Sequence, residues 1–471
     1  MAHRVQTVLS QLKGDHDGSS FGVLKRDLML QSLRAQFILS PARLKEMSLF
    51  MLHEMHMGLQ DQSRSTLRML PSYVYKRDPR QANGAMYALD LGGSNFRVIR
   101  MHLEHGKVRS VTSQKFAIPQ ARMVGKGEEL FDFIAESIDT FFQGHGFSAE
   151  KSQDLPLGFT FSFPVQQLKI NSGTLIQWTK EFKASGVEGN DVVPLLKVAM
   201  LKWGIKLNVV ALCNDTVGTL VTQYFADDTT EMGVILGTGS NACYWERASA
   251  VTKDPTVKRL GDKVDVIINM EFGNFDSTNC LTIPLTAYDD ALDAASENKG
   301  AQRFEKMISG KYLGELSRRV LLNLAEANVL PKTFAESPTL SKPYNFGSDI
   351  AGMCVADKHP GLPMIDAYFK QLGLATTSED RLVVREVCEL VCRRAAQLAG
   401  MAIAATLLKH GKQYNATVAV DGSVYEKQPG FRAAMQRAIA AVLGDAAGVR
   451  TVLTRDGSGV GAGLIAALQV V

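Results

Sequence analysis

The chain lacks the features that mark several large classes of protein. Its net charge of +4 is spread along 471 residues with no block of Lys and Arg, so nucleic acid is not an expected partner. Its six cysteines form no C-x-x-C pair and no zinc-ligand spacing, so we expect free thiols in a reducing compartment. The most apolar helix candidate, residues 398–408, is about half the length that spans a bilayer, so we expect a core helix and no membrane span. What remains is a globular protein long enough for two or three domains.

Apolar periodicity predicts an α/β protein. Residues up to about Leu70 read as helices, and Ser40 and Pro41 suit the N-cap and the first helical position of one of them. Further strands are expected at residues 84–116, 157–163, 209–213, 232–236, 264–269, 416–424 and 451–453, and further helices at 128–144, 302–328, 378–409 and from 459 onward. No low-complexity linker divides the chain, so the pattern favours two lobes built from related strand-turn units.

Two strand-like runs each end in a glycine-rich turn and continue into a second apolar run. The first is YALDLGGSNFRVIRM at Tyr87–Met101, and the second is GVILGTGSNACYW at Gly233–Trp245. Each predicts a β-hairpin whose turn exposes backbone amides, and glycine lets those amides approach an anion closely. Two such turns in one chain suggest two lobes that grip a polyphosphate.

Between the two turns, Asn214 and Asp215 follow the apolar run Val209–Cys213. A carboxylate at this position lies where a strand ends, which is where ligands bind in open α/β sheets. The same position suits a residue that caps the next helix, together with Thr216. The spacing alone favours neither interpretation.

The segments around these turns carry a resemblance to a known family. LGFTFSFP at Leu157–Pro164, with Ile170-Asn171, Leu175 and Trp178-Thr179-Lys180, resembles the hexokinase signature. Similar segments are the turn at Asp90, the run Cys213–Gly218, GTGSNACY, INMEFG from Ile268, GAQRFEKMISGKYLGEL from Gly300 and VDGSVY from Val420. The resemblance covers nearly everything from about Gly84 to Leu464.

The resemblance implies a single catalytic unit with the actin-like ATPase (ribonuclease H-like) α/β fold, in which a deep cleft separates two lobes. Residues 1–82 would be helices that belong mostly to the large lobe. Residues 83–214 would form the small lobe, residues 215–455 the large lobe, and residues 456–471 a helix that returns to the small lobe.

The implied activity is ATP-dependent phosphorylation of glucose and related hexoses at the 6-hydroxyl, the first step of glycolysis. This reaction needs a base near the hydroxyl and a cation near the transferred phosphate, and the resemblance gives these roles to Asp215 and Lys180. The implied sugar-binding residues are Ser162, Thr179, Lys180, Asn214, Asp215, Asn241, Glu271 and Glu305. By local pattern alone, Glu305 would be a solvated residue on an amphipathic helix, whereas Glu271 follows a hydrophobic strand.

ATP and Mg²⁺ are the implied nucleotide and metal ion. Asp90 would approach Mg²⁺ through water, and no direct protein ligand to the metal is expected. The implied nucleotide contacts are Asp90, Gly92, Gly93, Ser94, Asn95, Arg97, Gly237, Thr238, Gly239, Gly422 and Ser423.

The sequence departs from the family pattern beside the sugar site. Glu181 stands where glycine is common, and Phe272, Asn274 and Asp276 stand where Trp, Ala and Gly are usual. These changes flank the implied site and remove no catalytic group, so they leave the sugar preference open.

Two other functions fit parts of the pattern. A sugar sensor on a hexokinase scaffold is expected to lack the base or Lys180, and neither is missing. An actin-like or chaperone ATPase lacks the LGFTFSFP and Asn214-Asp215 elements. The sequence does not fix the oligomeric state, and a homo-oligomer stays open.

The first residues suggest a cellular address. Arg4-Val5, a gap of five residues and Gln11-Leu12 resemble the type 2 peroxisomal import signal. We therefore expect an import receptor as a partner and a peroxisome-like organelle, such as a glycosome, as the location. The alternatives are an amphipathic helix that docks on the large lobe, and a cytoplasmic enzyme.

Overall fold

The computed structural model describes residues 18–93, 95–148, 152–179, 181–411 and 415–470. The import motif at residues 4–12 and the predicted contacts Ser94 and Lys180 lie outside the described residues.

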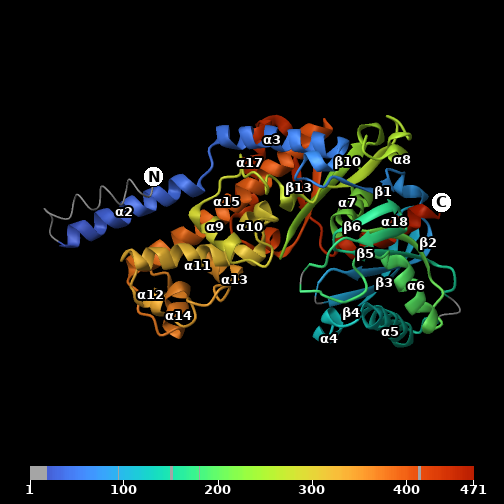
Figure 1. Cartoon of the computed structure of the whole chain (residues 1–471), viewed down its shortest axis with the longest axis horizontal. Coiled ribbons are helices and arrows are strands. Elements are labelled where there is room, and N and C mark those ends of the chain that lie inside the picture. Colours follow the sequence, from blue (N-terminus) through green and yellow to red (C-terminus); the bar gives the residue numbers. More distant parts are fainter. Residues whose placement is uncertain (1–17, 94, 149–151, 180, 412–414, 471) are drawn as a thin grey trace.

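Two β-sheets form the centres of the two lobes (Figure 1). The small-lobe sheet has the order β4-β3-β2-β5-β8, and the large-lobe sheet has the order β1-β11-β10-β9-β12-β13. The small-lobe strands are β2 (Gly84–Leu91), β3 (Asn95–Glu104), β4 (Lys107–Ala117), β5 (Pro156–Phe161) and β8 (Asn208–Cys213). The large-lobe strands are β1 (Leu70–Tyr75), β9 (Thr230–Leu236), β10 (Ser240–Arg247), β11 (Asp265–Asn269), β12 (Thr417–Asp421) and β13 (Arg450–Leu453). A separate hairpin pairs β6 (Val165–Lys169) with β7 (Ser172–Leu175).

The two sheets share one topology. In each sheet, three consecutive antiparallel strands are followed by two parallel strands: β4-β3-β2 then β5-β8, and β11-β10-β9 then β12-β13. Strand β1 is added at the outer edge of the large-lobe sheet, where it pairs antiparallel with β11. Both predicted hairpins, β2–β3 and β9–β10, are confirmed. The repeated sheet is the actin-like ATPase architecture that the sequence predicts.

Helices cover both sheets. The longer ones are α2 (Gly18–Phe37), α3 (Pro41–Gln60), α5 (Gly127–His145), α6 (Val192–Lys202), α7 (Asp215–Ala226), α11 (Gly310–Glu326), α15 (Ser378–His410), α17 (Phe431–Leu443) and α18 (Gly457–Gln469). The shorter ones are α4 (Gln120–Val124), α8 (Pro255–Lys258), α9 (Ala287–Ala294), α10 (Arg303–Ile308), α12 (Thr333–Glu336), α13 (Ser348–Ala356), α14 (Pro363–Gln371) and α16 (Ser423–Lys427). Ser40 caps α3 as predicted, since its side chain accepts a hydrogen bond from the Arg43 amide.

The sequence prediction is wrong at three places in this list. The residues just before position 70 are not helical and lead into strand β1, and the β6–β7 hairpin was not expected. The helix predicted over 302–328 is broken at Ser309, whose backbone is extended. There the Gly310 amide donates to the Gly237 carbonyl at 2.7 Å, so contact with the glycine-rich turn of the large lobe interrupts the helix.

Helix α15 matches the helix predicted over 378–409 within one residue and extends well beyond the apolar segment 398–408. It is the one described helix that is long and apolar enough by composition to cross a membrane, and 94% of its most apolar window is buried inside the protein. Its residues Cys388 and Cys392 are buried free thiols, as are most of the other cysteines. The helix is therefore the centre of the large-lobe core.

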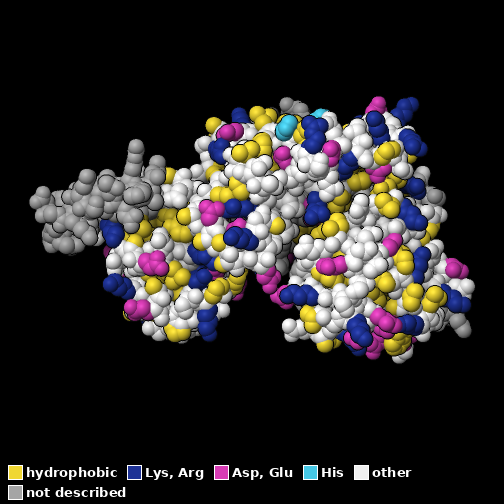
Figure 2. Space-filling view, in the orientation of Figure 1, with side chains coloured by type: hydrophobic (Ala, Val, Ile, Leu, Met, Phe, Trp, Pro, Cys, Tyr) yellow, Lys and Arg dark blue, Asp and Glu magenta, His cyan; other side chains and the backbone are white. Residues whose placement is uncertain are grey.

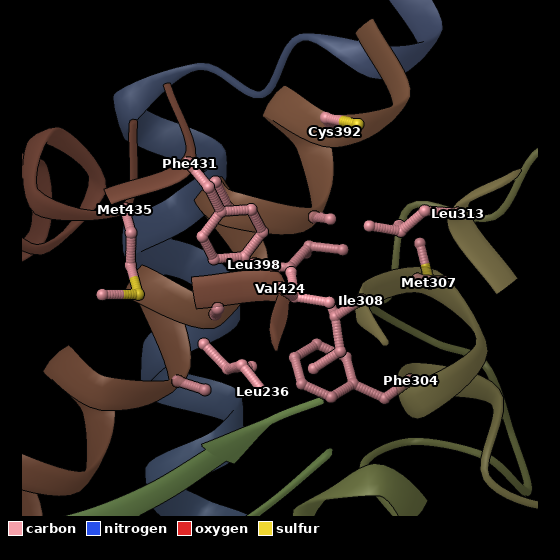
Figure 3. Packing of buried hydrophobic residues seen from close by; sticks show 14 of the residues in the cluster. Leu236, Phe304, Met307, Ile308, Leu313, Cys392, Leu398, Val424, Phe431 and Met435 are labelled. Atoms are coloured by element: carbon pink, nitrogen blue, oxygen red, sulfur yellow. The ribbon is translucent and has the colours of Figure 1, made fainter. Parts of the chain in front are cut away.

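The large-lobe core supports the loops that follow its strands. Figure 3 shows Leu236 at the end of β9, Phe304 and Ile308 of α10, Val424 of α16 and Leu398 of α15 packed against one another. Each of the first four lies within three residues of a predicted ligand contact. The site loops are therefore anchored by buried apolar neighbours.

Helices α7 and α18 lie between the two sheets and join them in one apolar cluster. The helices approach so closely that a Cβ atom at Gly461 would lie 2.0 Å from the Gly218 carbonyl oxygen. A Cβ at Gly218 would meet the Ser458 carbonyl oxygen at 2.4 Å. Only glycine fits at this crossing.

Candidate active site

The carboxyl ends of three parallel small-lobe strands lie side by side. Asp90 in β2 pairs with Thr160 in β5, and Thr160 pairs with Cys213 in β8. The predicted residues that follow these strands therefore share one edge of the sheet. Gly92 and Ser162 are close enough that a Cβ atom on Gly92 would lie 3.1 Å from the Ser162 Oγ.

Asn214, and not Asp215, caps helix α7. The Asn214 Oδ1 accepts hydrogen bonds from the Thr216 amide at 3.0 Å and from the Thr216 hydroxyl at 2.8 Å. Asp215 is the first residue of the helix, and its half-buried carboxylate also accepts from the Thr216 amide, at 2.9 Å. Because Asn214 supplies the cap, the helix does not need Asp215 for that purpose.

A polar network joins Asn214 to the large lobe. The Asn241 Nδ2 lies 3.5 Å from the Asn214 Oδ1, 3.2 Å from the Glu271 Oε1 and 2.9 Å from the Asn269 Oδ1. Asn269 also donates to the Glu271 Oε1 at 2.9 Å. Asn269 was not predicted, although it is the last residue of β11 and lies two residues before the predicted contact Glu271. The structure thus brings three predicted sugar residues together.

Glu305 joins this site from helix α10 and is not a solvated surface residue. Its Oε2 accepts from the Ser240 amide at 2.8 Å, and the residue is half-buried. A Cβ atom on Gly239 would lie 2.9 Å from this Oε2, and one on Gly273 would lie 3.0 Å from the Glu305 Cβ. The glycines of two loops therefore make the space that the carboxylate occupies.

The predicted nucleotide loops of the large lobe are in contact. Gly422 has a positive φ of 116°, and a Cβ atom there would lie 2.3 Å from the Leu236 carbonyl oxygen. The turn Gly237–Gly239 therefore packs against the start of α16, where Ser423 lies. The Lys311 amide donates to the Thr238 carbonyl at 3.1 Å and holds the turn from its other side.

Charged residues from three segments meet beside the strand ends. The buried Asp90 accepts from the Ser458 hydroxyl at 3.0 Å and lies 3.3 Å from the Arg97 guanidinium, which also pairs with Asp456. Burial raises the pKa of the Asp421 carboxyl, and the charge of Asp456 raises it further. Asp421, Asp456 and Ser458 were not predicted, and only their position after or near glycine-rich turns could have indicated them.

The loop that carries Thr179 is fixed by aromatic packing. The Trp178 ring meets Phe163 edge-on at 4.8 Å and stacks on Phe182 at 5.3 Å, and its indole N–H donates to the Ala184 carbonyl at 2.8 Å. Thr179 follows this anchored tryptophan on the small-lobe side of the site. The signature residues around it are therefore partly structural.

The surface is hollowed between the two lobes, and acidic side chains lie at the edge of the hollow (Figure 2). Two lobes with polar and charged groups on facing loops suit a substrate that is bound from both sides.

Comparison with known proteins decides the family. Two hexokinase family models match this chain, one over residues 29–225 and the other over residues 231–468. The chain belongs to the hexokinase family. It is therefore an enzyme that phosphorylates hexoses at the 6-hydroxyl with ATP, the first step of glycolysis.

Individual hexokinases are similar to almost the whole chain. Hexokinase-2 of Oryza sativa subsp. japonica is 41% identical over 459 residues, which cover 94% of this chain and 91% of that protein. Hexokinase-1 of Homo sapiens is 40% identical over 461 residues, which cover 96% of this chain and 49% of that protein. This hexokinase chain thus spans about half the length of the human relative.

A solved hexokinase has the same fold. The structure of a hexokinase from Schistosoma mansoni complexed with glucose superposes with a TM-score of 0.86 at 34% identity, and the match covers 94% of this chain and 99% of that one.

Proposed function

We propose that this hexokinase transfers the γ-phosphoryl group of ATP to glucose with Asp215 as the general base. Asp215 stands at the first turn of α7, beside the network of Asn214, Asn241 and Glu271. A base at that position takes the proton of the 6-hydroxyl as the oxygen attacks the phosphorus, which is typically worth about 10² to 10⁴ in rate. The observation that carries the proposal is the joining of residues from both lobes in one network.

The sugar hydroxyls would be bound by that network, by Glu305 and by the small-lobe residues Ser162 and Thr179. Asn side chains offer both a donor and an acceptor, and carboxylates accept from two hydroxyls at once. Glucose is the sugar in the related Schistosoma mansoni complex. Lys180 follows Thr179 and would place a cation near the transferred phosphate.

The nucleotide residues suit ATP together with Mg²⁺. The described residues contain no group of three His, Cys, Asp or Glu side chains that could hold a metal ion. Asp90 is a single buried carboxylate at a strand end, which fits one contact to Mg²⁺ through water. When bound, Mg²⁺ would neutralise charge on the phosphates, and the amides of Gly92, Gly93, Thr238 and Gly239 would donate to them, since the Gly237 amide already donates to the Gly239 carbonyl at 3.0 Å.

A coupled assay tests the activity. The purified chain is incubated with Mg²⁺, ATP and one sugar from a panel of glucose, mannose, fructose and galactose, and hexose 6-phosphate is followed enzymatically. We expect product with glucose and little ATP hydrolysis without sugar. ATP hydrolysis of equal rate with and without sugar would contradict the proposal.

We also propose that residues 4–12 direct the enzyme to a peroxisome-like organelle through the type 2 receptor. The support is the sequence motif alone, with Arg4 and Leu12 at its two ends. A fluorescent fusion of residues 1–20 should give punctate signal that Arg4→Ala or Leu12→Asp abolishes. Diffuse signal from the unmodified fusion would refute the proposal.

A further inference from the structure

We propose that Asp276 is a positioning residue that holds two sugar-site carboxylates, Glu271 and Glu305, in place, an inference that rests on the sugar-binding role proposed above. Asp276 is 1% exposed, and its carboxylate faces a loop of its own chain. Its Oδ1 accepts from the Leu281 amide at 2.9 Å. Its Oδ2 accepts from the Thr282 amide at 2.6 Å, the Thr282 hydroxyl at 3.1 Å and the Ile283 amide at 3.0 Å. One side chain thus closes the loop 276–283.

The closed loop is fastened to the helix that carries Glu305. Ser277 lies next to Asp276, and its Oγ accepts from the amide of Arg303, the first residue of α10, at 3.0 Å. That amide has no partner within its own helix, so Ser277 supplies the missing acceptor. Glu305 lies two residues farther along α10, and its position therefore depends on where Ser277 stands.

Aromatic packing in the core also joins helix α10 to the segment 271–277. The Phe304 ring meets Phe272 at 5.7 Å and Phe275 at 5.4 Å, both edge-on. Helix α10 is therefore held against the segment 271–277 at Arg303 and Phe304, the two residues before Glu305. A shift of this segment would carry the carboxylate with it.

Glu271 lies at the other end of the same segment. Its backbone is left-handed, with φ of 52°, and this conformation is costly for a residue other than glycine. The Asn274 amide and side chain donate to the Glu271 carbonyl at 3.1 and 3.4 Å, which closes a turn toward Asp276. Asp276 in turn donates its own amide to the Thr66 Oγ1 at 2.9 Å. Asp276 is also left-handed, with φ of 51°, so the segment holds a costly backbone conformation at Glu271 and at Asp276, where these hydrogen bonds fix it.

Loss of the Asp276 carboxylate would leave buried donors without acceptors, so the loop must rearrange. A misplacement of about 1 Å at a binding group commonly costs up to about 10²-fold in catalysis. Glu271 belongs to the affected segment and Glu305 to the helix fastened to it, whereas the nucleotide residues Gly237, Gly422 and Asp90 belong to neither. We therefore expect the binding of glucose to weaken and the binding of ATP to stay nearly unchanged.

The test is Asp276→Asn in the full chain. Asparagine keeps an acceptor for Leu281 but turns an NH₂ group toward the Thr282 and Ile283 donors. We expect KM for glucose to rise about tenfold, with KM for ATP changed less than about twofold.

Asp357→Asn is the matched control. Asp357 is 2% exposed, follows α13, and accepts from two amides of the first turn of α14, Met364 at 2.9 Å and Ile365 at 3.1 Å. This variant should lose similar thermal stability and keep its KM for glucose. Equal KM changes in the two variants, or equal changes for glucose and ATP in Asp276→Asn, would overturn the proposal.

Two further measurements separate this proposal from the function on which it rests. Glu271→Gln and Glu305→Gln should each raise KM for glucose, and if neither does, the sugar site itself is wrong. If Asp276→Asn does not fold, Ser277→Ala replaces it, because it removes only the acceptor of the Arg303 amide. Ser277→Ala should raise KM for glucose several-fold, and an unchanged KM would overturn the positioning role.

Discussion

At the scale of single residues, the predicted nucleotide side of the site contains charged side chains that pair with one another. Arg97 lies between Asp90 and Asp456, and Ser458 donates to Asp90. Burial lowers the pKa of Arg97, but the charge of Asp90 and the contact with Asp456 outweigh it, so the net shift is upward. Burial raises the pKa of the Asp421 carboxyl, and the charge of Asp456 raises it further.

The raised pKa of Asp421 predicts a dependence of stability on pH. The folded protein holds this proton more tightly than the unfolded chain, so stability is present at low pH and falls as pH rises through the folded pKa. Asp421→Asn removes the free-energy cost of keeping a buried carboxylate ionised. It should therefore raise Tm at pH 7 but have little effect near pH 4. Calorimetry at both values is the measurement. A Tm difference that is the same at both would contradict the prediction.

Single residues also show where sequence reasoning reaches its limit. The strand-end position of Asp215 could be predicted, but the sequence could not decide that Asn214 would take the capping role. Glu305 looked solvated by its helical pattern, because the partner that covers it, the Ser240 amide, is 65 residues distant in sequence. The sequence does not distinguish Asn269 from its neighbours, because it reads as the last residue of a buried strand. Such contacts depend on tertiary structure.

At the scale of elements, helices α7 and α18 form the contact on which both lobes depend. They lie between the sheets, and α7 begins with Asp215. Their glycines allow backbone to touch backbone, which side chains would prevent.

This contact predicts the effect of Gly461→Ala. The new Cβ would overlap the Gly218 carbonyl oxygen, and neither backbone segment can move freely, so the free energy of unfolding should fall by about 3 kcal/mol. The urea midpoint is the measurement. Gly22→Ala in helix α2 is the control, since nothing lies within 4 Å of its Cβ position, and it should be neutral or slightly stabilising. Equal midpoints for the two variants would refute the account of this helix crossing.

Helices and strands could be predicted where the apolar pattern was long and depended only on residues close in sequence. The hairpins, helix α5 and most of α15 follow from periodicity and glycine turns, within one or two residues at their ends. The break between α10 and α11 could not be predicted, because it depends on the contact of Gly310 with Gly237. Strand β1 is short and has no local turn signal before it.

At the scale of the whole molecule, the site is divided between lobes. Ser162, Asn214 and Asp215 follow small-lobe strands, whereas Asn241, Glu271 and Glu305 come from the large lobe. The hollow between the lobes is visible in Figure 2. The repeated motifs predicted the two lobes, and the resemblance to hexokinases predicted their fold and the cleft between them.

This division predicts closure on sugar binding. A ligand that touches both lobes favours the closed state by its differential affinity, and closure excludes water from the phosphoryl group. The radius of gyration from small-angle scattering should fall when glucose is added to saturation. Galactose, if it is not a substrate in the coupled assay, is the control sugar. A radius unchanged by saturating glucose would contradict the prediction.

The central claim is that Asp215 takes the proton of the sugar hydroxyl, and the turnover of Asp215→Asn tests it most directly. Asparagine is nearly isosteric and keeps an oxygen for the Thr216 amide, but it cannot accept a proton. We predict that the variant binds glucose within a few-fold of the unmodified enzyme and that kcat falls by about 10² to 10⁴. The glucose Kd from intrinsic fluorescence and kcat from the coupled assay are measured on the same preparation. A kcat within about threefold of the unmodified enzyme, with glucose still bound, would contradict the account.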